Sequence, residues 1–253
     1  MLPHLMVAPT GARRQKSDHP ALPITLDEIV TEARACAEAG ADGLHLHLRD
    51  AGGGHLLDAA GYRAALDRLR QDLPDMQVQI TTEAVGIYDA ATQRDIALNS
   101  GAALVSASVA ELTRDGIETA RAFYQTCADR GIAIQHILYG LEDCDLLMQV
   151  LPRPLVEDPG LQLIFVLGRY AKDQNSSPAD LDPFTDWLAG TGLTPDWMVC
   201  AFGPGETDCL IEAHRRGGKL RVGFENSLWH ADGSLASSNA DRVRALRAAI
   251  AAG

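Results

Sequence analysis

Two histidines alternate with leucines in the segment Leu44-His45-Leu46-His47-Leu48, a pattern typical of a β-strand. Successive strand residues point to opposite faces, so His45 and His47 share one face and the leucines share the other. Two imidazoles side by side in a protein interior need polar partners, and one metal ion supplies a partner to both. The spacing therefore indicates a metal site, with a pair of hydrogen-bonded core histidines as the alternative.

An arginine and a glutamate share one face of a second strand-like segment, residues 220–225, where they occupy positions 221 and 225. If this segment is the last strand of a closed barrel, Glu225 reaches His45 and His47 across the mouth. Two imidazoles and a carboxylate form a familiar catalytic zinc set with an open position, and iron or manganese also accepts these ligands. We expect one divalent metal, with zinc preferred. Arg221 is then a fixed cation beside an anionic substrate or, alternatively, half of a buried ion pair.

Four further side chains are candidates for the same pocket on weaker signals. Thr81 and Thr82 end a predicted strand and can hydrogen-bond a substrate oxygen, although threonines there are more often structural. Glu83 follows them as a pocket acid or a plain loop charge. His136 lies in another predicted strand and points inward or belongs to the core.

A basic cluster lies in the first long loop, where Arg13 and Arg14 are followed by Lys16. Arginine and lysine there suit a carboxylate or phosphate ligand. An ordinary solvated charge cluster explains the pattern equally well. We keep Arg13 as a candidate substrate-binding residue.

The composition limits the function classes. The chain has 253 residues, a formal net charge of −12 and 46% hydrophobic residues, which allows one large core and disfavours binding to nucleic acid. No apolar run approaches the roughly 20 residues of a membrane helix, and no signal peptide is evident. The five cysteines are scattered and odd in number, as in reduced cytoplasmic proteins. We expect a cytoplasmic protein that binds neither nucleic acid nor membranes.

The elements that must position these residues alternate along the chain. The expected strands cover residues 5–8, 43–48, 77–82, 103–106, 132–139, 161–167, 196–201 and 220–224. The expected helices cover residues 26–39, 61–71, 89–99, 116–130, 142–150, 178–188, 206–216 and 238–252. Such alternation implies parallel strands with helical crossovers. About eight units in this length favour a single (β/α)8 TIM-barrel domain over residues 1–253, with an open doubly wound sheet as the alternative. Loops 10–25, 50–60 and 168–177 are expected at the barrel mouth.

Taken together, several segments resemble the β-keto acid cleavage enzymes, the family of 3-keto-5-aminohexanoate cleavage enzyme. The similarity covers nearly the whole chain and is carried by motifs that are specific only as a set. These motifs are Ala8-Pro9-Thr10-Gly11-Ala12, Asp18-His19-Pro20-Ala21-Leu22-Pro23-Ile24-Thr25, Ala39-Gly40-Ala41, His45-Leu46-His47-Leu48-Arg49-Asp50, Ile80-Thr81-Thr82, Phe165-Val166-Leu167-Gly168, Arg221-Val222-Gly223-Phe224-Glu225 and Ala236-Ser237-Ser238-Asn239-Ala240.

The resemblance implies a TIM-barrel enzyme with zinc on the positions of His45, His47 and Glu225. In the family a β-keto acid chelates the metal and exchanges acyl groups with acetyl-CoA, giving acetoacetate and a new CoA thioester. The metal there acts as a Lewis acid. The family's arginine matches Arg221 and its strand-3 hydroxyl matches Thr81, so we expect both to be catalytic. A homotetramer is also implied.

The same comparison reveals departures from the family pattern. Asn226 occupies the position of an aspartate that pairs with the arginine and acts as general base, and an amide cannot accept a proton at neutral pH. Two glutamates of a strand-5 motif are Gln135 and His136 here. Arg13 replaces an acid that faces the amino substrate, so the substrate is expected to differ and to carry an acidic side chain.

Three functions follow as hypotheses. The first is a metal-dependent enzyme that cleaves a β-keto acid with acetyl-CoA, in which His136 or Glu83 replaces the missing base. The second is a metal-dependent lyase or hydrolase that works without CoA. The third is a non-catalytic metal-binding or ligand-binding descendant, because catalytic carboxylates are expected to be absent.

Overall fold

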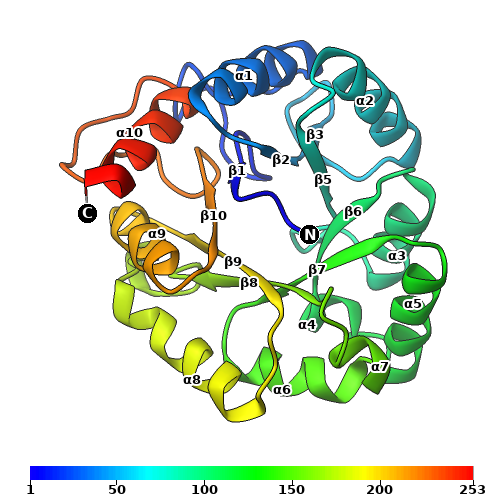
Figure 1. The fold of residues 1–253 in the computed structure, drawn as a ribbon. Helices are drawn as coiled ribbons and strands as arrows, with labels where there is room; N and C mark the ends of the chain where they lie inside the picture. The colour runs from blue at the N-terminus through cyan, green and yellow to red at the C-terminus, as the bar shows by residue number, and fades with distance from the viewer. Residues whose placement is uncertain (253) are drawn as a thin grey trace.

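The strands of the computed structural model, which describes residues 1–252 except the side chain of Lys172, close into a parallel barrel (Figure 1). Its eight strands, in order around the ring, are β1 (Leu5–Val7), β2 (Gly43–Leu46), β5 (Gln77–Thr81), β6 (Leu104–Ser108), β7 (Ala133–Leu138), β8 (Gln162–Leu167), β9 (Asp196–Ala201) and β10 (Lys219–Val222). The ring closes because β1 pairs with β10 on one side and with β2 on the other. This confirms the TIM barrel and rules out the open sheet.

Helices cover the outside of the barrel (Figure 1). They are α1 (Leu26–Ala39), α2 (Ala59–Asp72), α3 (Ala90–Asn99), α4 (Val109–Leu112), α5 (Ile117–Asp129), α6 (Leu141–Val150), α7 (Arg153–Val156), α8 (Asp182–Thr191), α9 (Glu206–Arg215) and α10 (Asn239–Ala252), with 3-10 turns η1 (Lys172–Gln174) and η2 (Pro178–Leu181). Helix α1 has the bounds expected from its sequence. The side chains of Thr25 and Glu28 form a reciprocal capping box, and Gly40 ends the helix at a φ of 104°.

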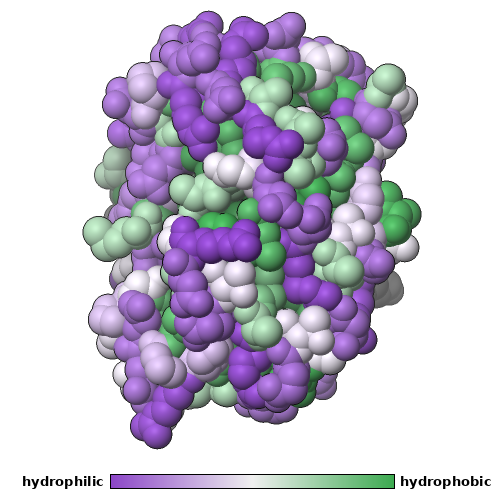
Figure 2. All heavy atoms as spheres, turned by 90° about the vertical axis from the view of Figure 1, so that its right-hand side faces the viewer, coloured by the Kyte–Doolittle hydropathy of each residue, from purple (hydrophilic) through white to green (hydrophobic). Residues whose placement is uncertain are grey.

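Buried hydrophobic side chains form three separate clusters, the smallest of which packs Leu22 against Phe224, Leu228 and Ala236. The other two are larger. One lies between the strands and the helices and includes Leu44 and Leu46, both fully buried. The other fills the barrel interior, where Met6, Ile164 and Met198 are fully buried. The outer side over α3 and α5 is largely hydrophilic, with hydrophobic side chains showing between polar ones (Figure 2). No helix in the described residues is long and apolar enough to cross a membrane.

Three expectations about the elements were wrong. The strand expected at 43–48 ends at Leu46, and residues 50–60 are not one loop. Instead, β3 (Leu48–Arg49) pairs antiparallel with β4 (His55–Leu56). Asp50 closes this hairpin, because its Oδ1 accepts hydrogen bonds from two backbone amides of the glycine-rich turn. The third difference is that β10 stops at Val222, so Glu225 lies in the turn after the strand rather than at its end.

Candidate active site

The side chains of His45, His47 and Glu225 converge at the mouth of the barrel. The Nε2 atoms of His45 and His47 are 3.2 Å apart. Oε2 of Glu225 lies 3.7 Å from Nε2 of His45 and 3.4 Å from Nε2 of His47. Both histidines are buried, with 2% and 1% exposure. Among the described residues, these three form the one group of histidine, cysteine and acidic side chains able to hold a metal ion.

The donor set fits a divalent metal. Zinc binds such ligands at about 2.0–2.1 Å, so donors at the corners of a tetrahedron lie about 3.3 Å apart. The three observed separations are close to that value. Burial, and then Arg221 nearby, lower the pKa of His45 well below its ordinary value, so its imidazole is neutral and can coordinate. Burial opposes ionisation of Glu225, but the charge of Arg221 beside it holds the pKa of its carboxyl well below the usual range.

Two glutamines, Gln79 and Gln135, orient the imidazole of His45 through consecutive hydrogen bonds. Its Nδ1 lies 2.7 Å from Oε1 of Gln79, and Nε2 of Gln79 donates to Oε1 of Gln135 at 2.9 Å. Because an amide oxygen only accepts, Nδ1 of His45 carries the proton and Nε2 presents its lone pair to the other two ligands. The fully buried glutamines thus select the tautomer that binds a metal.

Replacing Gln79 by leucine is therefore expected to weaken zinc binding about ten- to a hundredfold, as outer-shell substitutions typically do. Competition against a chromophoric chelator measures this loss. Gln79→Glu is the matched control, since its carboxylate also accepts from Nδ1 and should keep the affinity near that of the unmodified protein. Undiminished zinc affinity in Gln79→Leu would show that the hydrogen bond does not orient the ligand.

Backbone hydrogen bonds hold the turn that carries Glu225. The Glu225 amide donates to the carbonyl of Ala8 at 3.0 Å, and the Phe224 amide donates to Oδ1 of Asn239 at 2.7 Å. Gly223 has a φ of 144°, which favours glycine, and a Cβ there would lie 2.5 Å from the Ala8 carbonyl oxygen. The turn thus delivers the carboxylate that the strand itself does not reach.

The loop after β1 packs directly against Glu225, one of the candidate metal ligands. Gly11 has a φ of 63°, and a Cβ there would lie 2.7 Å from Cγ of Glu225, so only glycine fits. Arg49 fixes this loop from the β3–β4 hairpin. Its guanidinium donates to the carbonyls of Gly11 at 2.7 and 3.0 Å, of Arg14 at 2.9 Å and of Gly53 at 2.7 Å.

Arg221 lies beside the candidate metal ligands, and not all of its hydrogen-bond donors are used. Its side chain is 5% exposed, its Nη2 donates to Oε1 of Glu225 at 3.3 Å, and the same nitrogen lies 3.3 Å from Sγ of Cys200. The Nε of Arg221 has no partner among the described residues. A buried cation with an unused donor lining a pocket is suited to a substrate oxyanion.

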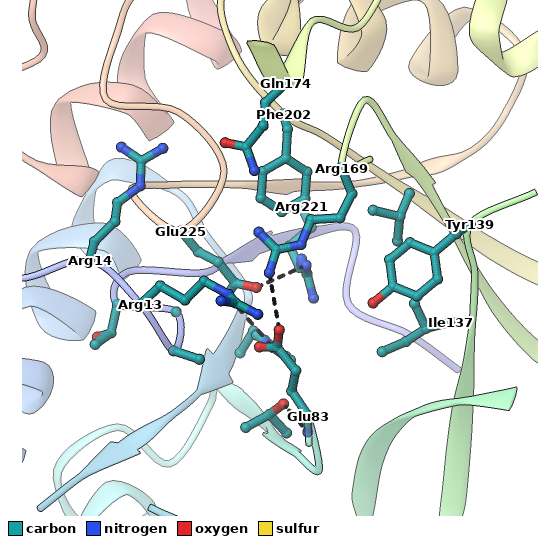
Figure 3. Close-up of a pocket in the computed structure, with 16 residues that line it drawn as sticks. Arg13, Arg14, Glu83, Ile137, Tyr139, Arg169, Gln174, Phe202, Arg221 and Glu225 are labelled. Carbon is teal, nitrogen blue, oxygen red and sulfur yellow. Dashed lines mark hydrogen bonds and ion pairs between the residues drawn. The ribbon is translucent and has the colours of Figure 1, made fainter. Parts of the chain in front are cut away.

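These groups line a pocket at the barrel mouth (Figure 3). Its charged lining consists of Arg13, Arg14, Arg169, Arg221, Glu83 and Glu225, alongside His45. Oε1 of Glu83 lies 3.2 Å from Nη2 of Arg169, whose guanidinium rests 4.9 Å above the ring of Phe202. Thr81 also lines the pocket, and its Oγ1 accepts a hydrogen bond from the Glu83 amide at 3.0 Å.

Three residues expected in the pocket do not line it. Thr82 donates its hydroxyl to the carbonyl of Ser106 at 3.0 Å. His136 packs against Tyr124, with ring centroids 4.9 Å apart, and lines a different cavity under the helices. Its position on β7 has the opposite parity to the pocket residue Ile137. The side chain of Asn226 is fully buried and has no hydrogen-bond partner among the described residues.

Three residues at or beside the site were not singled out from the sequence. Arg169 follows β8 directly, and its place just after a strand in an expected mouth loop was the available signal. Arg49 was noticed only as part of a motif, because its contacts are to backbone carbonyls. His55 packs against His47 at 5.3 Å between ring centroids and binds the Glu83 carbonyl through Nε2 at 2.9 Å. Only the pairing of β3 with β4 places His55 there, and the sequence did not predict that pairing.

Comparisons with known proteins agree with this geometry. The family model described as beta-keto acid cleavage enzyme matches residues 4–252. The 3-keto-5-aminohexanoate cleavage enzyme of Fusobacterium nucleatum is 28% identical over 239 residues, which cover 92% of this chain and 85% of that protein. The 3,5-dioxohexanoate:acetyl-CoA acetone transferase of Paraburkholderia graminis is 28% identical over 279 residues, covering 96% and 88%.

A solved structure shares the fold at lower sequence identity. The ternary complex of ObcA with a C4-CoA adduct and oxalate superposes with a TM-score of 0.71 at 16% identity, covering 92% of this chain and 64% of that one. This likeness supports the barrel alone. The match of the family model over nearly the whole chain goes further, and it shows that this chain belongs to the beta-keto acid cleavage enzyme family.

Proposed function

We propose that this protein transfers acyl groups between a β-keto acid and acetyl-CoA, releasing acetoacetate and a new CoA thioester. The observation that carries this proposal is the convergence of His45, His47 and Glu225 beside Arg221, in one pocket that also holds a second carboxylate, Glu83. The family match and the names of the relatives support the reaction class.

A divalent metal bound by the three ligands would supply a Lewis acid for the keto and carboxylate oxygens of the substrate. We propose zinc, because two neutral imidazoles and a carboxylate at these separations suit it. Arg221 would orient the substrate and stabilise the negative charge that develops on its oxygen, through the donors that Glu225 does not occupy.

Glu83 is our proposed general base. It is the one carboxylate among the described pocket residues that does not belong to the metal cluster. Glu83 would remove a proton from carbon 2 of the β-keto acid, and that carbon would attack the thioester carbonyl and expel the CoA thiolate. The thiolate would then attack the original keto carbon and break the bond between carbons 2 and 3. Protonation of carbon 2 by Glu83 completes acetoacetate and restores the base.

The substrate is proposed to differ from 3-keto-5-aminohexanoate. An ammonium group requires a carboxylate partner, but both pocket carboxylates already face arginines. Glu225 lies 3.3 Å from Arg221, and Glu83 lies 3.2 Å from Arg169. Family membership also motivates our proposal of a homotetramer, which light scattering would test.

Product analysis with carbon-13 acetyl-CoA tests the reaction. Metal-loaded protein is incubated with a panel of β-keto acids, with and without labelled acetyl-CoA. The expected result is label at carbons 3 and 4 of acetoacetate, together with an unlabelled CoA thioester of the remaining acyl group. Cleavage without CoA would instead identify a lyase or hydrolase. No turnover of any panel member would favour a descendant that binds ligands without catalysis.

A further inference from the structure

We propose that Glu206 is a positioning residue for the candidate metal ligand Glu225, and that a buried ion pair with Arg242 fixes its carboxylate for that role. This inference rests on the metal site of the proposed function, but it does not depend on which reaction that site performs. Glu206 begins helix α9 and does not line the pocket, so it acts through the backbone of the turn after β10.

The ion pair between Glu206 and Arg242 is fully buried. Helices α9 and α10, which carry the two residues, pack against each other and against β10 (Figure 1). Apart from Arg221 in the pocket, these are the only buried aspartate, glutamate, lysine or arginine side chains among the described residues. Replacing such a pair by apolar side chains of similar size is often neutral or stabilising, because both charges lose their water on burial. The pair therefore indicates a need for a polar group at this place.

The polar group is needed as an acceptor for the backbone amide of Gly223. Because β10 ends at Val222, this amide lies beyond the strand ladder, and Oε1 of Glu206 accepts its hydrogen bond at 3.3 Å. A buried amide without an acceptor is costly, and an apolar side chain at position 206 would leave it without one. Glu206 thus satisfies the chain where it leaves the strand and turns towards the candidate metal ligands.

The loop before α9 also holds the other side of Glu225. The amide of Gly203 donates to the carbonyl of Asn226 at 3.3 Å. Gly203 and Glu206 therefore fix the backbone one residue after Glu225 and two residues before it. The two amides between these points already donate to other parts of the fold. The position of Glu225 consequently depends on α9 as well as on β10.

Arg242 orients the carboxylate of Glu206. Its Nη2 contacts Oε2 of Glu206 and also lies 3.3 Å from Oγ1 of Thr207. Its Nη1 lies 3.3 Å from Nδ1 of His230, so the guanidinium is itself held from two sides. Because the arginine occupies Oε2, the carboxylate presents Oε1 to the Gly223 amide.

Zinc affinity, measured by competition with a chromophoric chelator, tests the positioning role. Glu206→Leu/Arg242→Met replaces the ion pair by apolar side chains of similar size, so the zinc-free protein should unfold at a temperature close to that of the unmodified protein. The Gly223 amide then has no acceptor, and zinc affinity is expected to fall about tenfold, the low end for outer-shell partners of metal ligands. Asp196→Leu/Lys219→Met is the matched control, because it removes an ion pair at the other end of β10 and should leave zinc affinity unchanged.

Glu206→Gln is a second variant that changes the shape of the side chain very little. A glutamine amide has one acceptor oxygen and Arg242 can only donate, so the arginine should take that oxygen. The amide nitrogen would then face the Gly223 amide, donor against donor. Zinc affinity should again fall about tenfold.

The effect is expected to act through Glu225. In a Glu225→Ala background, Glu206→Gln should leave the weaker residual zinc affinity unchanged, because the ligand that Glu206 positions is gone. The same fold-loss in that background would show general damage to the site and would overturn the positioning role.

Unchanged zinc affinity in both Glu206 variants would also overturn the positioning role, while the zinc site of the proposed function would stand. Absence of zinc binding in the unmodified protein would overturn both. If zinc affinity falls as expected but no β-keto acid is turned over, the positioning role stands and the proposed reaction fails.

Discussion

Replacing Glu83 by glutamine is expected to lower turnover about 10²- to 10⁴-fold, the usual contribution of a positioned general base. The amide keeps the size of the side chain and can still contact Arg169, but it cannot accept a proton from carbon 2. Glu83 is not one of the metal ligands, so the metal content should not change. Exchange of the carbon-2 hydrogens with deuterium oxide, monitored by NMR, reports proton removal from carbon 2. This exchange should slow in parallel with turnover.

Two results separate this role from a structural one. Glu83→Asp retains a base at a shorter reach and should recover part of the exchange rate. Turnover in Glu83→Gln within a few-fold of the unmodified protein would exclude Glu83 as the base. The base would then have to come from elsewhere in the pocket or from water.

Replacing Arg221 by methionine is expected to lower kcat about 10²- to 10³-fold, the typical effect of losing one preorganised donor to a developing oxyanion. Methionine fills similar space but removes the charge and the unused Nε donor. The donor atoms of His45, His47 and Glu225 remain, so the metal should still bind. Steady-state kinetics and metal analysis on the same preparation measure both effects.

Arg221→Lys is the informative control. Lysine keeps a positive charge beside Glu225 but loses the planar fork of donors, so kcat should recover only in part. Full activity in Arg221→Met would show that the arginine only pairs with Glu225, which was the alternative interpretation of this residue.

The barrel and the cluster of His45, His47 and Glu225 could be predicted because both depend on simple periodicities. Alternation between strands and helices implied the parallel barrel, and strand parity placed His45 and His47 on one inward face. Closure of the barrel then brought the end of β10 near β2, with only β1 between them. Glu225 was correctly predicted to lie near His45 and His47, but it was wrongly placed at the end of the strand. A turn at Gly223 presents its carboxylate instead.

The rest depends on contacts that leave little trace in a sequence. His136 was expected at the site because a histidine in a strand can face either side, and the register of β7 turns it towards Tyr124. The role of Arg49 consists of hydrogen bonds to backbone carbonyls, whose acceptors have no sequence signature. Arg169 lines the pocket because of the conformation of the turn after β8, which the sequence does not specify.

Metal analysis of purified protein tests the central claim most directly, namely that His45, His47 and Glu225 together hold one divalent ion. The unmodified protein loaded with zinc and passed through a desalting column is expected to retain about one ion per chain, as three ligands at these separations predict. His45→Ala and Glu225→Ala should each retain little zinc under the same conditions while remaining folded by circular dichroism. Zinc retention in both variants equal to that of the unmodified protein would contradict the account.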